Sequence, residues 1–260
     1  MADSALTIES AIAEDVTLLT SVFMDGFAND VHTQMKTMGQ KNERFANGMR
    51  EAISSWIQDH SRYSVLKATD VATKQILGWI CWASREYEDD AERSRRKESS
   101  EKHAAALIRE AQTSRQDQLD NVAKLIRPPK HNLQSGEPLD PINQLESLTS
   151  EHLQQWMIKV MPPGTMCMYV VALVVHPSYQ SRGAGSALIG WGTARADADA
   201  VFCWVKSSES GHRAFAKNGF KVAESLQVDL DEFSPGPCPV YADRKWGQSI
   251  FRYMIRPPHN

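Results

Sequence analysis

The sequence lacks several features that would assign it to a specialised class of protein. Its four cysteines lie far apart and form no C-x-x-C pair, which argues against a zinc ribbon or a thioredoxin-type site. No apolar run approaches the roughly 18 residues of a membrane span, and the N-terminus lacks the basic-then-apolar pattern of a signal peptide. The net charge of -3 gives no general attraction to nucleic acid or to an anionic membrane. We therefore expect a soluble cytoplasmic protein, with the nucleus as an open alternative, and no nucleic-acid, membrane or metal partner.

The residues that are present are those of an ordinary globular chain. Hydrophobic residues make up 42% and charged residues 23% of 260 positions, which is enough for a sizeable core. Cys81, Cys167 and Cys203 lie inside apolar runs and are expected to be buried thiols of a reducing compartment. The N-terminal third shows one short strand pattern, two helical patterns and a hairpin pattern. These elements are predicted over Ala5 to Glu9, Glu14 to Phe27, Arg44 to Asp59, Ser64 to Thr69 and Gln75 to Ser84.

The composition changes sharply after this hairpin. Half of the residues from Arg85 to Asp120 are charged, and a Pro- and Gly-rich stretch follows them. We interpret about 85–144 as an insertion between two strands, partly helical and largely solvated. Its charge run is typical of a solvated helix face, and a docking surface for a partner protein is the alternative. A further helix is predicted over Leu145 to Val160.

The second half of the chain alternates between apolar strands and helices. Met166 to Val175 is a nearly continuous apolar run, as expected of a strand buried on both faces. A loop, a helix and another strand follow it, and this order predicts a right-handed β-α-β crossover. The remaining elements are predicted as helices over Ser186 to Ala196 and Gly211 to Asn218, and as strands over Ala200 to Val205, Phe220 to Leu230 and Ser249 to Ile255.

Two glycines, Gly183 and Gly185, lie where the apolar strand gives way to a helix. Helix N-termini present unpaired N–H groups and the positive end of the helix dipole, and glycines there let phosphate oxygens approach the backbone. Glycines at such a place also serve as simple turn residues, so the pair alone supports either interpretation. No Lys-Ser/Thr follows, which excludes a Walker loop, and Leu188 excludes the G-x-G-x-x-G pattern.

Together with its flanks, the stretch VVHPSYQSRGAGSALI resembles the acetyl-CoA loop of the GNAT superfamily of N-acetyltransferases. The family's core motif, Gln/Arg-x-x-Gly-x-Gly/Ala, corresponds to Gln180 to Gly185. A second stretch, SSESGHRAFAKNGF from Ser207 to Phe220, is similar to the segment that follows in this family, and the style resembles that of fungal-type small acetyltransferases. The resemblance implies one mixed α/β domain over 1–260 with a GNAT fold. Such a fold has a central, mostly antiparallel twisted sheet, splayed at the acetyl-CoA site and flanked by helices, and it would carry the charged insertion.

The resemblance also implies roles for the matched positions. The backbone of Leu173, Val174 and Val175 would pair with the pantetheine arm of acetyl-CoA. Ser208 would lie beside the pantetheine, and Phe215 and Lys217 near the far end of the cofactor, with a core role as the alternative for Phe215. Arg182 would add a charge-assisted contact to phosphate, with a solvated loop charge as the alternative. The N–H groups expected to hold the pyrophosphate are those of Gln180, Ser181, Arg182, Gly183, Ala184, Gly185 and Ser186.

The acid and base of the reaction are harder to assign. Acetyl transfer needs a neutral amine, a stabilised carbonyl oxygen and a proton for the leaving thiolate. Where the family places a glutamate base this chain has Tyr169, a second acidic position falls near Val171, and the family's tyrosine acid is replaced by Phe215. Tyr169, acting through an ordered water, and Glu86 are therefore the first catalytic candidates. Other candidate bases are Glu88, Asp25, Asp30 and Glu209, and His176 is expected to fix the loop.

These observations predict an acetyl-CoA-dependent N-acetyltransferase. It would act without a metal on a small-molecule amine, by direct attack in a ternary complex, as a monomer or homodimer. The loop from Glu232 to Gly247, with Tyr241, Trp246 and mixed charges, is expected to rim the acceptor pocket. Two alternatives stay open: a non-catalytic acyl-CoA-binding or regulatory domain, favoured by the missing Glu and Tyr, and a protein acetyltransferase acting on lysine or an N-terminus.

Overall fold

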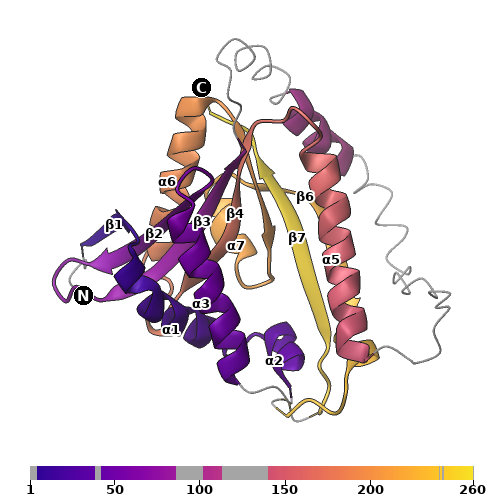
Figure 1. Ribbon diagram of the computed structural model, residues 1–260. Coiled ribbons are helices and arrows are strands. Elements are labelled where there is room, and N and C mark those ends of the chain that lie inside the picture. The colour runs from indigo at the N-terminus through magenta and orange to yellow at the C-terminus, as the bar shows by residue number, and fades with distance from the viewer. Residues whose placement is uncertain are drawn as a thin grey trace.

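One seven-stranded sheet forms the centre of the molecule (Figure 1). The computed structural model describes residues 5–38, 42–85, 102–112, 140–239, 241 and 243–259. The strands are β1 (Leu6–Ser10), β2 (Tyr63–Asp70), β3 (Ile76–Arg85), β4 (Cys167–Val175), β5 (Phe202–Ser207), β6 (Lys221–Asp229) and β7 (Gln248–Arg256). Their order in the sheet is β1-β2-β3-β4-β5-β7-β6. Neighbouring strands are antiparallel except β4 and β5, which are parallel.

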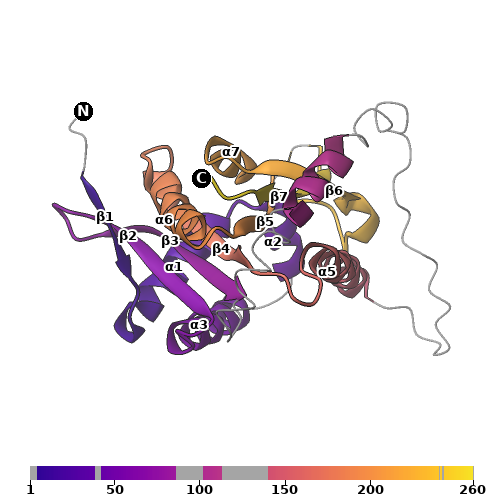
Figure 2. The same ribbon diagram turned by 90° about the horizontal axis from the view of Figure 1, so that it is seen from above.

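Helices cover both faces of this sheet (Figure 2). They are α1 (Val16–Phe27), α2 (Val31–Thr37), α3 (Asn42–Gln58), α5 (Pro141–Val160), α6 (Ala184–Asp199) and α7 (His212–Lys217), with the 3-10 helices η1 (Ala13–Asp15), η2 (Pro177–Tyr179) and η3 (Leu230–Phe233). α6 and α7 pack on one face, over apolar side chains of β2 to β5. α1, α3 and α5 pack on the other face, and α2 lies between α3 and one end of β7 (Figure 1).

This architecture confirms the predicted mixed α/β fold with a mostly antiparallel, open sheet. The hairpin of β2 and β3, the β4–α6–β5 crossover and the closing pair of β6 and β7 all form where the sequence patterns indicated. α2 was not predicted, because Val31 and Met35 are the only apolar side chains among its seven residues. Two apolar positions are too few to reveal a helical repeat in the sequence.

The four cysteines are buried and free. The predicted burial of Cys81, Cys167 and Cys203 is therefore confirmed, and Cys238 is buried as well. Burial raises the pKa of the Cys81 and Cys167 thiols to about 12, so neither is a reactive thiolate at neutral pH. In the part of the chain that the structure describes, no helix is long and apolar enough to cross a membrane.

β4 departs from the prediction of a strand buried on both faces. Its first half is buried, but Val171 is 38% exposed and the residues after it are mostly half-buried. β5 accompanies β4 only from Cys167 to Val170. Val171 has no opposite residue on β3, because its two neighbours pair with Cys81 and Trp82, and such a bulge bends the strand. Beyond Val170 no strand of the described chain pairs with β4 on the side of β5, so this edge of β4 is open among the described residues.

The insertion is only partly as predicted. Residues 86–101 and 113–139 lie outside the described residues, whereas 102–112 form a helix. This helix is not a solvated face, because Ala104, Leu107 and Ile108 are buried in the same core cluster as Trp156 and Val160 of α5. Positions three and four apart share one face of a helix. The expectation of a largely solvated insertion is therefore wrong for this helix, which contributes side chains to the core.

We expect Leu107→Ala to lower the free energy of unfolding by roughly 2 to 3 kcal/mol, because removing a buried side chain loses packing contacts and leaves a cavity. Leu107 is only 6% exposed. Urea unfolding followed by tryptophan fluorescence measures the change. Ala106→Gln, on the exposed side of the same helix, is the control and should change the free energy by less than about 0.5 kcal/mol. A Leu107→Ala protein as stable as the wild type would show that this helix is not part of the core.

Candidate functional site

The open edge of β4 borders a cavity of about 630 Å³. The cavity lies between the end of α1, the second half of β4, the loop before α6, and the segment from the end of β5 into α7. Ten of the thirteen residues predicted to bind acetyl-CoA line it: Leu173, Val174, Val175, Gln180, Ser181, Gly183, Gly185, Ser186, Ser208 and Lys217. The structure therefore brings both sequence motifs to one place.

The backbone before α6 is shaped to expose N–H groups. Ser181 has φ 63° and Gly183 has φ 88°, two left-handed conformations that turn the chain sharply between η2 and α6. The first hydrogen bond of α6 runs from the N–H of Ala187 to the carbonyl of Gly183, so the N–H groups of 184–186 have no acceptor within the helix. No side-chain hydrogen bond caps this helix end, and the first turn contains no acidic residue. An anion with several oxygens complements such a helix end.

Side chains around the loop hold this backbone in place. His176 Nδ1 accepts a hydrogen bond from the N–H two residues later at 3.2 Å, which agrees with its predicted role in fixing the loop. Tyr179 Oη donates to Gln75 Oε1 at 2.6 Å, and Gln180 Nε2 donates to the Val175 carbonyl at 3.2 Å. The loop is thus tied to the residue just before β3 and to the last residue of β4, and its N–H groups are positioned before any ligand arrives.

Positive charge surrounds the loop end of the cavity. Arg213 and Lys217 lie one turn apart on α7 and both line the cavity. Arg182 lies beside it, with its guanidinium carbon 5.3 Å from the centroid of the Tyr179 ring. Arg213 was not among the predicted residues, although its spacing of four from Lys217 places both side chains on one helix face. This end of the cavity suits a phosphate-bearing ligand.

Three predicted cofactor residues do not line the cavity. Phe215 is 3% exposed and packs edge-on against Phe220, with the ring centroids 5.3 Å apart. The expected contact of Phe215 with the cofactor is therefore corrected to a core role, because this side of α7 faces the sheet. Ala184 is also buried, at 1% exposure, and can contribute only its backbone. The side chain of Arg182 lies over Tyr179 instead of lining the cavity.

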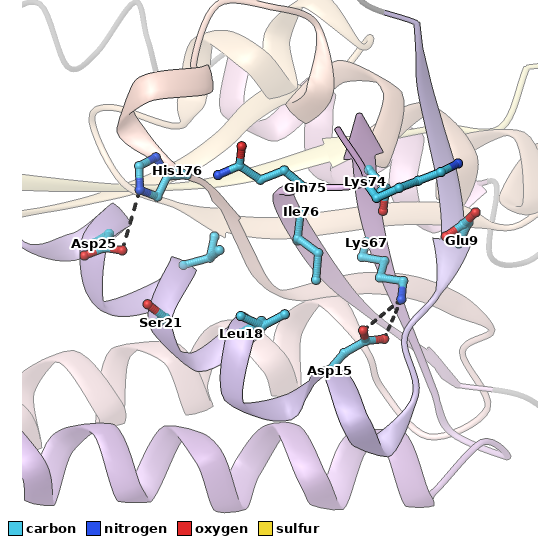
Figure 3. A pocket seen from close by; sticks show the side chains of 12 residues that line it. Glu9, Asp15, Leu18, Ser21, Asp25, Lys67, Lys74, Gln75, Ile76 and His176 are labelled. Atoms are coloured by element: carbon cyan, nitrogen blue, oxygen red, sulfur yellow. Dashed lines mark hydrogen bonds and ion pairs between the residues drawn. The ribbon is translucent and has the colours of Figure 1, made fainter. Parts of the chain in front are cut away.

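One predicted base, Asp25, belongs to a second pocket of about 470 Å³ beside the loop (Figure 3). There the Asp25 Oδ2 atom lies 3.6 Å from His176 Nε2. An ion pair between Asp15 and Lys67, 2.7 Å long, lies toward the other end of this pocket. Asp25 and His176 do not line the larger cavity. Asp25 therefore supports the loop from outside and is not placed to take a proton from a ligand in the cavity.

Asp30 is the one acidic side chain of the described chain that lines the larger cavity. It is the N-cap of α2, where its Oδ1 accepts from Thr33 N at 2.8 Å and from Thr33 Oγ1 at 2.7 Å. Glu209 is engaged by an arginine of β7, whose hydrogen bond holds the pKa of the Glu209 carboxyl below its usual value. Glu86 and Glu88 lie outside the described residues. Asp30 is thus the candidate base that the geometry retains.

Tyr169 is not at the cavity either. Its ring stacks on Trp204 with centroids 5.0 Å apart, and its Oη accepts a hydrogen bond from Arg62 at 3.4 Å. Tyr169 belongs to the half of β4 that is still paired with β5, so its side chain does not line this cavity. Trp246 was expected on the rim of the acceptor pocket, but it lies in the core. It is 3% exposed and donates from Nε1 to the Gly236 carbonyl at 2.7 Å, which makes it a core anchor of its loop.

Among the described residues no group of three or more His, Cys, Asp or Glu side chains could hold a metal ion. The cavity therefore offers a ligand backbone N–H groups, basic side chains, hydroxyls and one carboxylate. These groups can bind a large anion and position a second reactant, and they can accept or relay a proton.

Residues 153–220 match the model of the acetyltransferase (GNAT) family. Three solved structures share the fold at low sequence identity. Arylalkylamine N-acetyltransferase 2 from Aedes aegypti is 12% identical with a TM-score of 0.56, covering 98% of this chain and 99% of that one. A second Aedes aegypti protein, assigned as arylalkylamine N-acetyltransferase 7, is 12% identical with a TM-score of 0.58, covering 97% and 87%. An agmatine N-acetyltransferase is 14% identical with a TM-score of 0.51, covering 96% and 98%. No curated protein sequence matches the chain.

Proposed function

We propose that this chain is a GNAT-type enzyme that moves the acetyl group of acetyl-CoA to the amine of a small molecule. The match of residues 153–220 to the GNAT family model supports this proposal. One observation carries the proposal: the free N–H groups at the start of α6 open into the same cavity as the unpaired edge of β4. A ligand that uses both features needs a phosphate group and an extended chain of amides, and acetyl-CoA has both.

Different residues of the cavity would bind the pyrophosphate, the pantetheine arm and the thioester of acetyl-CoA. The pyrophosphate would accept hydrogen bonds from the N–H groups of 184–186, with Arg213 and Lys217 facing its charge. The pantetheine arm would lie along Leu173 to Val175 as an added strand, since this edge of β4 has no strand partner in the described chain. The thioester would then lie near Val171, where β4 and β5 part.

The reaction would proceed in two steps at this point. The lone pair of the neutral amine attacks the thioester carbonyl carbon, a C–N bond forms, and the carbonyl oxygen becomes an oxyanion. The bulge at Val171 frees backbone groups from the β3 ladder, and a backbone N–H there would stabilise the oxyanion. The C–S bond then breaks, its electron pair leaves on the CoA sulfur, and the thiolate takes up the proton that the amine nitrogen gives up through water.

A small acceptor is supported by the way in which the acceptor side is covered. α2 reaches from the end of α1 to β7, where His32 meets Phe251 edge-on with ring centroids 5.0 Å apart. Because α2 covers this side of the site, a small amine fits there more easily than an extended protein chain. The three structural neighbours are named for arylalkylamine and agmatine acetylation, which is in line with this choice.

We expect kcat/KM to rise with pH and its apparent pKa to follow the pKa of the acceptor amine. The reason is that neither strand position used for a base in this family is a carboxylate, so the amine must lose its proton to water. Rates measured with amines of different pKa test this expectation. An apparent pKa that stays fixed while the amine changes would contradict it and would point to a protein base.

If the apparent pKa stays fixed, Asp30→Asn tests whether the carboxylate of Asp30 is the protein base. Asparagine caps a helix as well as aspartate does, so this change keeps the cap of α2 and removes only the carboxylate. A protein base at Asp30 would lose on the order of 100-fold in kcat in Asp30→Asn. Asp25→Asn is the matched control, since Asp25 lies in the other pocket.

The proposed function is tested by thiol release from acetyl-CoA with a panel of amines, with mass spectrometry of the products. Acetylated amine and free CoA in equal amounts support the proposal. Binding of acetyl-CoA without any turnover would favour the non-catalytic alternative. Turnover with peptides but not with small amines would favour a protein acetyltransferase.

A further inference from the structure

Lys206 lies where β4 and β5 part. It follows Val205, the last residue of β5 that pairs with β4, and it opposes Tyr253 of β7. Its side chain is on the face of the sheet covered by α2 and α5, where Nζ lies 4.5 Å from the centroid of the Phe251 ring. Lys206 is also two residues before Ser208, which lines the larger cavity, so it lies close to the proposed reaction centre.

The charge of Lys206 is not matched by the rest of the described chain. Its pKa is lowered to about 8, first by burial and then by the charge of Lys36. No acidic side chain of the described chain offsets these two effects. At pH 7 the Lys206 side chain is nevertheless still mostly protonated. A cation over an aromatic face recovers only part of the hydration that burial removes. A half-buried cation without a partner in the described chain is costly, so this site is suited to an anion supplied from outside.

His32 provides a second group without a partner at the same ring. It contacts Phe251 from α2, and its Nε2 atom is buried with no hydrogen-bond partner among the described residues. Burial, the largest cause, lowers the pKa of His32 to about 4. The imidazole is therefore neutral at pH 7 and can donate one N–H. An ammonium and an imidazole N–H thus lie around Phe251 without an acceptor.

The nearby carboxylates already have partners. Glu146 pairs with Lys36 at 2.9 Å, and Glu224 pairs with Lys159 at 3.4 Å. Asp30 caps α2 through its Oδ1 atom. None of these acidic groups pairs with Lys206, so the negative charge that would complete the site is absent from the described chain.

On the basis of the proposed acetyltransferase function, we propose that Lys206 and His32 bind a carboxylate of the acceptor, so that the preferred substrate is an amine that also carries a carboxylate. The two oxygens of a carboxylate can accept from both donors at once. The charge also fits, because one ammonium and one neutral imidazole balance a single negative charge. A doubly charged phosphate would leave buried charge unmatched.

The test compares acceptors that differ only by a carboxylate. The pairs are tryptamine with tryptophan, histamine with histidine, and propylamine with 4-aminobutyrate, which vary the distance between amine and carboxylate. Thiol release from acetyl-CoA gives kcat/KM for each member, calculated on the concentration of neutral amine because the carboxylate also changes the pKa of the amine. We expect the wild type to favour the carboxylate member of at least one pair by about 10-fold or more, and Lys206→Met to reduce that preference by about 10-fold. Lys206→Arg, which keeps the charge, should retain part of the preference.

Two controls separate binding from folding. Methionine has nearly the length of lysine and removes a half-buried charge, so Lys206→Met should fold and bind acetyl-CoA with the wild-type Kd. Lys221→Met removes an exposed lysine of β6 and should leave the preference unchanged. His32→Phe should reduce the preference in the same direction as Lys206→Met and gives an independent measurement.

The outcomes distinguish the two proposals. Equal kcat/KM for both members of every pair, or a carboxylate preference that survives in Lys206→Met and His32→Phe, would overturn the carboxylate site and leave the acetyltransferase function intact. No thiol release with any acceptor, from protein that binds acetyl-CoA, would overturn the proposed function and this inference with it.

Discussion

Gly185→Val is expected to weaken acetyl-CoA binding about 100-fold, or roughly 2.8 kcal/mol. Gly185 is the second residue of α6 and lines the cavity. A Cβ at this position would lie 3.5 Å from Val175 Cγ2, which is an ordinary contact, so the fold accepts a side chain there. The branched side chain would nonetheless occupy the space between β4 and the N–H groups of 184–186. Losing one or two charge-assisted hydrogen bonds to pyrophosphate accounts for an effect of this size.

Calorimetric titration with acetyl-CoA measures the effect, and the same helix provides the control. A Cβ at Gly190 would meet nothing within 4 Å, so Gly190→Ala should bind acetyl-CoA as the wild type does. At Gly183 the backbone conformation limits substitution. A Cβ there would point into open space, but the φ of 88° is strained for most residues with a side chain. Gly183→Asn should therefore bind better than Gly183→Ala, since asparagine tolerates this conformation. Wild-type affinity in Gly185→Val would mean that this loop does not hold phosphate.

Gly192→Ala is expected to destabilise the fold by about 3 kcal/mol. α6 crosses β3 at this residue, where Trp82 is fully buried and its Nε1 donates to the Leu188 carbonyl at 3.4 Å. A Cβ on Gly192 would lie 2.0 Å from Cε2 of the Trp82 indole, closer than any two atoms can pack. The helix or the indole must move, and the interior offers little room because cores are close-packed.

Urea unfolding of Gly192→Ala and Gly190→Ala measures this difference on one helix. Gly190→Ala should be as stable as the wild type or up to about 1 kcal/mol more stable, because alanine favours the helix more than glycine. Equal stability of the two variants would show that α6 does not pack on Trp82 in the way described. A loss confined to Gly192→Ala, with the acetyl-CoA Kd retained in the folded fraction, agrees with a purely structural role for this glycine.

The loop before α6 was predictable from the sequence because its chemistry is local. Gly183, Gly185 and the strand before them are adjacent in the chain, so the free N–H groups of the helix start follow from the sequence alone. The hairpin and the crossover follow in the same way from short-range periodicity. The positions of the side chains along β4 could not be predicted from such local patterns. Tyr169 was named as a catalytic candidate because it stands where the family places a glutamate base, and that position shows neither the bulge at Val171 nor the stacking of Tyr169 on Trp204.

The acceptor side could not be predicted, since it depends on contacts between distant segments. His32 of α2 and Lys206 of β5 meet at Phe251 of β7, and no pattern within one segment shows this. α2 itself is too short to give a periodic signal. Asp30 was one of several candidate carboxylates, and only the fold separates it from Asp25, which lies in the second pocket.

A structure of the protein with a non-reactive thioether analogue of acetyl-CoA tests the central claim most directly. We expect the pyrophosphate oxygens within about 3.2 Å of the N–H groups of 184–186, and the pantetheine amides hydrogen-bonded to the edge of β4 beyond Val171. The thioether would then lie between β4 and β5, with Asp30 and Lys206 on the acceptor side. An analogue bound in the pocket of Asp25 and His176, or no binding at millimolar concentration, would contradict the account.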